Sequence, residues 1–215
     1  MSHTRDDAWA LLAELTKSQA LRRHALAVEA TMRHLARTSG RTDEDEITLW
    51  GLAGMLHDFD YERFPQEPEH PLEGMKILRE RGWPESLVLA IGGHAFGTGI
   101  PRETHMARAL LAADELTGFV GACALVRPSK KIADVPVESV LKRLKEKAFA
   151  KGVDRAYVTK GVEEWGTPLP DLVKLVLEAQ IPIADRLGLG GSPAADLPDA
   201  PAPPIPPMPS LPPSS

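Results

Sequence analysis

A helix-patterned apolar run that ends in an adjacent histidine and aspartate constrains this sequence more than any other feature. Residues 47–56 are apolar on nearly every side of a helix, which is typical of a central, buried helix. His57 and Asp58 follow directly. Burying two ionisable side chains is costly unless hydrogen bonds or an opposite charge compensate, and a metal ion compensates directly. The run therefore predicts a buried helix that leads into a metal site.

Further imidazole and carboxylate side chains lie beside other apolar segments of the chain. His24 borders the apolar stripe of one predicted helix, and Asp114 lies among apolar neighbours in another. His70 begins a His-Pro-x-x-Gly turn, and His94 follows two glycines. One such histidine alone is more often packed or exposed than a ligand. Together with His57 and Asp58, however, these side chains are ligand types for Zn, Mn, Fe or Co ions that serve in chemistry.

The rest of the chain reads as helical. No stretch shows the alternation of period two that is typical of a strand, so the fold is predicted to be all-α, with eight or nine helices. Residues 1–188 are expected to form one helical domain, and residues 189–215 a Pro-rich, low-complexity tail that is disordered. Apolar stripes at helical spacing, capping residues, and Gly or Pro at the helix ends predict the helix boundaries. The helices are expected at about 6–16, 18–40, 42–58, 71–82, 84–94, 102–127, 137–147, 153–165 and 169–187.

Charge and cysteine content narrow the function further. The net charge of −5 argues against a surface that tracks DNA or RNA, which needs clustered Lys and Arg, although a small basic pocket is compatible with it. The single cysteine, Cys123, lies in an apolar helical run and is expected to be a small buried hydrophobe. The N-terminal residues show no signal-peptide core, and the most apolar stretch, 116–126, is too short to span a membrane. We therefore expect a cytoplasmic protein that has no membrane partner.

The order of the candidate ligands resembles a known family. His24, His57-Asp58 and Asp114, set in an all-helical pattern, resemble the HD-domain superfamily of metal-dependent phosphohydrolases over most of residues 18–127. The expected fold is accordingly an HD-domain helical bundle. One branch of this superfamily, the HDIG type, is similar to the chain in a longer series of residues: His57-Asp58, His70-Pro-x-x-Gly74, Ile77-Leu78 and His94. The series departs from that branch at one point, because Phe59-Asp60 replaces the usual Ile-Gly.

The resemblance implies a ligand set. His24, His57, Asp58 and Asp114 would hold one divalent ion, which could be Mn, Co, Zn, Mg or Fe. In the branch that holds two ions, Asp58 would bridge them, and the two additional histidines would correspond to His70 and His94. The cofactor is therefore one or two divalent ions per chain.

The implied reaction is hydrolysis of a small phosphate ester, a nucleotide or a related metabolite, by metal-activated water. Asp58, Asp60 and Glu62 are the candidate catalytic carboxylates, the last two for orientation or proton transfer. A basic loop breaks the chain after the helix that carries Asp114 and could clamp an anionic substrate group; its candidate binding residues are Arg127, Lys130 and Lys131.

Two other functions stay open at this point. Some HD-fold proteins hold two irons and activate dioxygen, as inositol oxygenase and the phosphonate-cleaving oxygenases do, and His70 and His94 make this possible here. The second open function is that of a catalytically silent domain that binds a nucleotide as a signal. The intact set of candidate metal ligands counts against this function. The expected partner is a small anionic substrate and not a polymeric nucleic acid; the sequence does not specify an oligomeric state.

Overall fold

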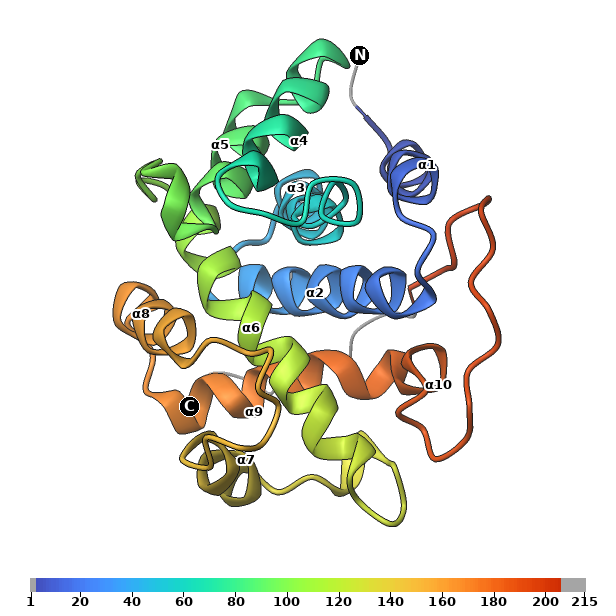
Figure 1. Cartoon of the computed structure of the whole chain (residues 1–215), viewed down its shortest axis with the longest axis vertical. Coiled ribbons are helices and arrows are strands. Elements are labelled where there is room, and N and C mark those ends of the chain that lie inside the picture. The colour runs from blue at the N-terminus through green and yellow to red at the C-terminus, as the bar shows by residue number, and fades with distance from the viewer. Residues whose placement is uncertain (1–2, 206–215) are drawn as a thin grey trace.

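A computed structural model describes residues 3–205, which form helices and connecting loops with no β-strand (Figure 1). The predicted all-α fold is thus confirmed. Three short 3-10 turns accompany the α-helices, and the last helix is a single turn that continues the one before it. The helices are α1 (Arg5–Leu15), α2 (Gln19–Thr38), α3 (Glu44–Leu56), α4 (Glu69–Glu80), α5 (Glu85–Gly93), α6 (His105–Leu125), α7 (Val137–Leu144), α8 (Arg155–Trp165), α9 (Leu169–Gln180) and α10 (Ala184–Leu187).

The pairing of α2 with α3 forms the centre of the core. Every residue of α3 from Trp50 to Leu56 is buried, as this apolar run predicts, because α2, α1, α5 and α6 surround it. Gly54 allows the close approach of α2, since a Cβ atom there would lie 2.7 Å from the carbonyl oxygen of Val28. His57 ends α3, and this packing therefore sets the depth at which its side chain lies.

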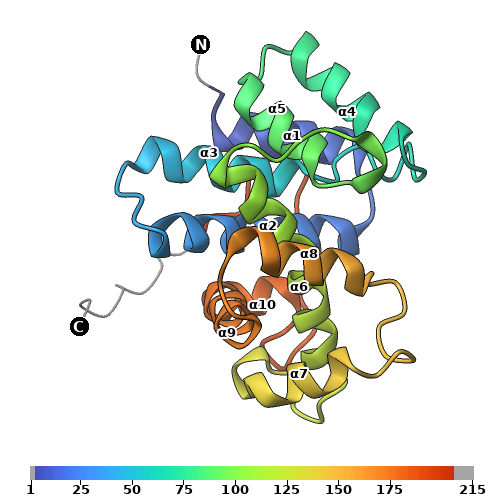
Figure 2. The same cartoon turned by 90° about the vertical axis from the view of Figure 1, so that its left-hand side faces the viewer.

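The long helix α6 joins the two halves of the molecule. In both views helices α1 to α5 form the upper part of the molecule and α7 to α10 the lower part, and α6 runs from one to the other (Figures 1 and 2). Thr104 is the N-cap of α6, and its side-chain oxygen accepts a hydrogen bond from the Ala107 N–H. Threonine is one of the residues favoured at an N-cap for this reason. Helix α8 crosses α6 at Gly161, where a Cβ atom would lie 2.7 Å from the Cα atom of Ala112. This crossing brings the loop before α8 next to Asp114 of α6.

His70 lies where a loop turns into helix α4. Its backbone has φ −80° and ψ 129°, which is not helical, so the regular helix begins at Pro71, as the sequence predicted. The extended backbone at His70 turns its buried side chain towards the end of α3.

The proline-rich segment beyond the last helix has no regular helix or strand in residues 192–205. The segment is nevertheless held against α1 and α2. The indole N–H of Trp9 donates to the carbonyl oxygen of Pro198 (3.0 Å), and Leu197 is 7% exposed. The part of the expected tail at 206–215 lies outside the described residues.

Two further expectations concern burial. No helix within residues 3–205 combines the length and the apolar composition that a membrane crossing requires. Cys123 lies buried in α6 as a free thiol, and burial raises its pKa to about 11. The side chain therefore behaves as the small hydrophobe that its apolar surroundings predicted.

Candidate metal centre

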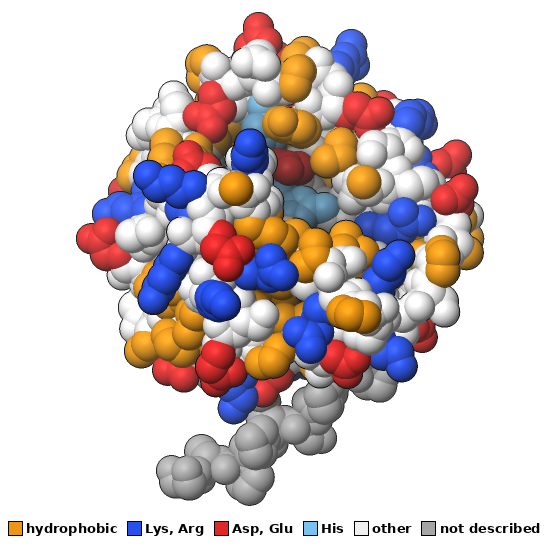
Figure 3. Space-filling view, turned by 60° about the horizontal axis from the view of Figure 1, so that its bottom comes forward, with side chains coloured by type: hydrophobic (Ala, Val, Ile, Leu, Met, Phe, Trp, Pro, Cys, Tyr) orange, Lys and Arg blue, Asp and Glu red, His pale blue; other side chains and the backbone are white. Residues whose placement is uncertain are grey.

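A cavity of about 460 Å³ opens on one face of the molecule, between the ends of α3 and α5, helices α2 and α6, and the loop before α8. Histidine and acidic side chains are visible at the bottom of this hollow (Figure 3). Five of the six predicted metal ligands line it, and the sixth, His57, lies directly behind two of them with no exposed surface. The five are His24, Asp58, His70, His94 and Asp114.

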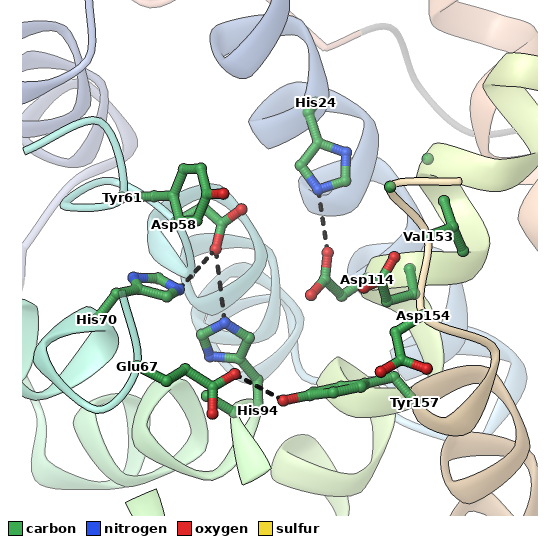
Figure 4. A pocket seen from close by; sticks show the side chains of 14 residues that line it. His24, Asp58, Tyr61, Glu67, His70, His94, Asp114, Val153, Asp154 and Tyr157 are labelled. Carbon is green, nitrogen blue, oxygen red and sulfur yellow. Dashed lines mark hydrogen bonds and ion pairs between the residues drawn. The ribbon is translucent and has the colours of Figure 1, made fainter. Parts of the chain in front are cut away.

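Asp114 is the meeting point of two histidines. Its Oδ1 atom lies 3.0 Å from Nε2 of His24 and 3.1 Å from Nε2 of His57 (Figure 4 shows the contact with His24). Nε2 of His57 is also 3.3 Å from Oδ2 of Asp58. Helices α2, α3 and α6 thus each deliver a side chain to this point. Ligand atoms of His24, His57 and Asp58 lie within 4.8 Å of one another, close enough to share one metal ion.

Asp58 also faces a second group of histidines. Its Oδ1 atom lies 3.1 Å from Nε2 of His70 and 3.5 Å from Nε2 of His94 (Figure 4). Ligand atoms of Asp58, His70 and His94 again lie within 4.8 Å of one another. The two oxygens of one carboxylate therefore point to two separate groups of imidazole nitrogens, which is the arrangement of a bridging ligand between two ions.

Backbone carbonyls fix the orientation of two of these imidazoles. Nδ1 of His57 lies 2.8 Å from the carbonyl oxygen of Gly54, and Nδ1 of His94 contacts the carbonyl oxygen of Ile91. Because a carbonyl oxygen only accepts, each Nδ1 carries a hydrogen, and in the neutral ring each Nε2 keeps its lone pair. Both lone pairs face Asp58, which is how metal-binding histidines are commonly held.

Asp60 plays the corresponding part for His70. Its Oδ1 accepts a hydrogen bond from Nδ1 of His70 (2.8 Å), and its Oδ2 accepts the Gly74 N–H (2.8 Å). A Cβ atom at position 74 would lie 2.7 Å from this carboxylate, which explains the glycine of the His-Pro-x-x-Gly turn. Asp60 is completely buried and is not part of the cavity lining. The structure therefore places Asp60 behind His70, where it orients that imidazole and does not reach the cavity surface.

The electrostatics of the centre favour a cation. Burial by itself lowers the pKa of His57, but Asp58 and Asp114 raise it well above its ordinary value. Nε2 of His57 is buried and makes no hydrogen bond, even though both carboxylates lie within 3.3 Å. An orphaned imidazole nitrogen between two carboxylates fits a divalent ion, and this mixture of nitrogen and oxygen donors suits Zn, Mn, Fe or Co.

The third candidate catalytic carboxylate, Glu62, lies elsewhere. Its Oε2 accepts the backbone N–H groups of Lys17 (2.7 Å) and Ser18 (3.1 Å), where the chain enters α2. It is not part of the cavity lining. Glu62 thus accepts hydrogen bonds from backbone N–H groups at the start of α2. The sequence could not predict this role, because it shows only that Glu62 lies in a loop beside Asp60.

The basic loop is also remote from the ligands. Arg127, Lys130 and Lys131 follow the end of α6, and none of them lines the cavity. From Asp114 the helix runs on to Leu125, a distance of about 16 Å at 1.5 Å per residue. The structure thus does not bring the expected phosphate clamp to the ligands, because a rigid helix separates the two.

Several lining residues carried no signal in the sequence. Tyr157 donates its hydroxyl hydrogen to Oε1 of Glu67 (2.7 Å) and accepts the Phe96 N–H (2.9 Å), closing one wall of the cavity. Burial, with Glu67 beside it, raises the pKa of Tyr157 to about 12. Asp154 and Glu115 complete this wall. Distant segments supply these side chains, so only the tertiary packing brings them together.

Comparison with known families agrees with this geometry. The family model of the HD domain matches residues 21–118. Residues 21–118 of this chain are thus similar to the HD domain. The matched range includes all six predicted ligands, from His24 to Asp114. The cavity wall formed by residues 152–157 lies outside the matched range. No curated protein and no solved structure matches the chain.

Proposed function

We propose that this HD domain is a phosphohydrolase that depends on divalent metal ions and cleaves a small phosphate ester, as in the HDIG-type branch. One observation carries the proposal: the two carboxylate oxygens of Asp58, which lines the cavity, face two groups of imidazoles whose Nε2 atoms are turned to this carboxylate. Such an open site, with ligands on one side and a solvent-filled cavity on the other, suits chemistry rather than structural support.

The ligands divide into two sets that share Asp58. A divalent ion held by them would supply Lewis-acid stabilisation of a phosphoryl group and a nucleophilic water near neutral pH. The first set is His24, His57, Asp58 and Asp114, and the second is Asp58, His70 and His94.

The protein's own contribution is orientation. The carbonyls behind His57 and His94 and the carboxylate of Asp60 behind His70 hold each ring so that Nε2 points to Asp58. On the opposite wall, the hydroxyl of Tyr157 is occupied by Glu67 and the Phe96 N–H, so it shapes the cavity. These fixed rings reduce the reorganisation that substrate binding requires.

Two alternatives make different use of the same ligands. A di-iron oxygenase is favoured by the second set, because Asp58, His70 and His94 complete a dinuclear site. A silent nucleotide-binding domain is less well supported, since within residues 3–205 no lysine or arginine lines the cavity. Iron content and oxygen consumption distinguish the oxygenase from the hydrolase.

The test is a phosphatase screen on full-length protein that was purified without chelator and loaded with Mn, Co, Mg or Zn. We expect phosphate release from at least one phosphate ester, and a loss of about 100-fold or more in Asp58→Ala. His105→Ala is the matched control, because His105 stacks on Trp165 outside the cavity, and it should keep its activity. Metal-loaded protein that releases no phosphate but contains two irons and consumes oxygen would support the oxygenase instead.

A further inference from the structure

The charge of the cavity limits which phosphate esters fit. Besides Asp58 and Asp114, the carboxylates of Glu67 and Asp154 line it, and within residues 3–205 no lysine or arginine does. Glu115 also lines the cavity, but burial, with Asp114 beside it, raises its pKa to about 8, so it adds little charge at neutral pH. Divalent ions at the ligand sets would offset the charge of one phosphoryl group. Additional phosphates that extend beyond the ions would face carboxylates with no basic side chain among them, and like charges in a cleft repel. The lining thus disfavours nucleoside diphosphates and triphosphates.

An apolar groove borders the cavity on the side of α2 and α6. It has a volume of about 220 Å³ and shares His24 and Gly118 with the metal cavity. In Figure 3, hydrophobic side chains border the hollow that holds the histidines. Small and aliphatic residues of α2, α6, α10 and the following segment form most of its surface: Ala27, Gly121, Ala122, Leu125, Leu187 and Leu189.

Several polar groups of the groove are engaged within the protein. Thr117 donates its hydroxyl hydrogen to Thr31 (3.1 Å), and the side-chain amide of Gln180 donates to the carbonyl oxygen of Thr117 (3.4 Å). Nη2 of Arg23 donates to the carbonyl oxygen of Ala195 (3.3 Å), whereas its buried Nε has no hydrogen-bond partner. Apolar surface, by contrast, is left open: Leu125 is 53% exposed although it is a large aliphatic side chain.

We infer that the substrate is a monophosphate ester of an apolar alcohol, whose apolar group lies in this groove over Gly118 while its phosphoryl group faces Asp58 and Asp114. The inference rests on the proposed function and specifies its substrate class. Two independent observations lead to it: the absence of basic side chains from the described cavity lining, and an adjacent apolar groove that shares His24 and Gly118 with the cavity.

The test compares esters of similar intrinsic reactivity. Hexyl phosphate and glycerol 3-phosphate both release a primary alcohol, so a difference in kcat/KM reports on recognition of the alcohol part. We expect the metal-loaded full-length protein to prefer hexyl phosphate by about tenfold or more, because burial of two methylene groups alone gives this factor. We expect ADP to be the poorest substrate.

Neighbouring residues supply a matched pair of variants. Leu125→Glu places a charge in the groove, whereas Val126→Glu places one at an equally exposed position that does not line it. Only Leu125→Glu should reduce the hexyl-to-glycerol ratio of kcat/KM, by about tenfold towards unity. Binding of the apolar dye N-phenyl-1-naphthylamine to chelator-treated protein tests the groove without turnover. The fluorescence of the dye should rise when the wild type or Val126→Glu is added, because the dye enters an apolar groove, and it should rise much less with Leu125→Glu.

The outcomes separate the inference from the proposed function. Hydrolysis without preference, or equal effects of Leu125→Glu and Val126→Glu on ester preference and dye fluorescence, would overturn the inference and leave the hydrolase intact. No hydrolysis of any ester would overturn the hydrolase and the substrate assignment with it. A lower molar mass of Leu125→Glu in light scattering would show that a second copy of the chain covers the groove, which also overturns the inference.

Discussion

Asp60 and His70 form a buried pair in which Oδ1 of the aspartate accepts the Nδ1 hydrogen of the histidine at 2.8 Å. The pair makes Asp60 a positioning residue for one of two ligand sets. It lies ten residues before His70 in the chain and is brought behind it by the turn that ends at Gly74, whose N–H occupies the other oxygen.

The first prediction concerns this pair. Asp60→Asn should weaken one of two metal-binding steps by about 10- to 100-fold, because His70 loses the carboxylate that orients it and raises its basicity. The step that depends on His24 and Asp114 should be unaffected. Isothermal titration of chelator-treated protein with Mn²⁺ measures both steps. Glu62→Gln, which changes a carboxylate outside the cavity, is the control, and equal titrations of the two variants would contradict the role of Asp60.

The second prediction tests the crossing of α6 and α8. Gly161→Ala should lower the free energy of unfolding by about 1–3 kcal/mol, since the added Cβ atom meets the backbone of Ala112 at 2.7 Å and neither helix can yield without moving. Gly152→Ala is the control, because nothing lies within 4 Å of a Cβ atom at that position. Urea unfolding followed by circular dichroism measures both variants. Equal stability of the two would show that the helices do not approach this closely.

The third prediction is a pH dependence of stability. Burial is the largest influence on His34 and lowers its pKa, although Glu178 at 3.4 Å acts in the opposite direction. The unfolded chain therefore takes up this proton more readily than the folded chain, and stability falls as the pH drops from about 6.5 towards the lowered pKa. His34→Gln should lose less stability than the wild type between pH 7.5 and pH 5.5. Thermal unfolding at the two pH values measures the difference, and identical shifts would contradict the effect of burial.

The fourth prediction concerns the proline-rich segment. Leu197→Ala should lower the free energy of unfolding by about 1–2 kcal/mol, because Leu197 is 7% exposed where the segment lies against α1 and α2. Asp196→Ala changes the preceding side chain, which is 85% exposed, and should have little effect. Chemical unfolding of both variants tests the contact. A stability of Leu197→Ala equal to that of the control would mean that the segment contributes nothing to the fold.

The helical fold was largely predictable because its signals are local. The apolar run up to Leu56, the N-cap at Thr104 and the break at Pro71 each depend on neighbours in the chain. The HD-domain order of histidines and aspartates is likewise a linear pattern. Its members lie at the ends or on the inner faces of buried helices, and the structure brings five of the six to one cavity and His57 directly behind it.

The rest of the site could not be predicted because it depends on distances between segments. Lys130 follows Asp114 closely in the sequence, but a rigid helix keeps the two apart. Glu62 lies next to the ligands in the chain and turns away to the start of α2. Asp154 and Tyr157 belong to a loop and helix that reach the cavity only because Gly161 allows α8 to pack on α6.

The most direct test of the central claim is the metal content of the chain measured by mass spectrometry after loading and removal of free ions. The account predicts two divalent ions per wild-type chain and less than one in Asp58→Ala, because both ligand sets include Asp58. Asp171→Ala, a change at an exposed carboxylate in the first turn of α9, should keep both ions. Metal content that is the same in Asp58→Ala and in the wild type would contradict the assignment of the centre.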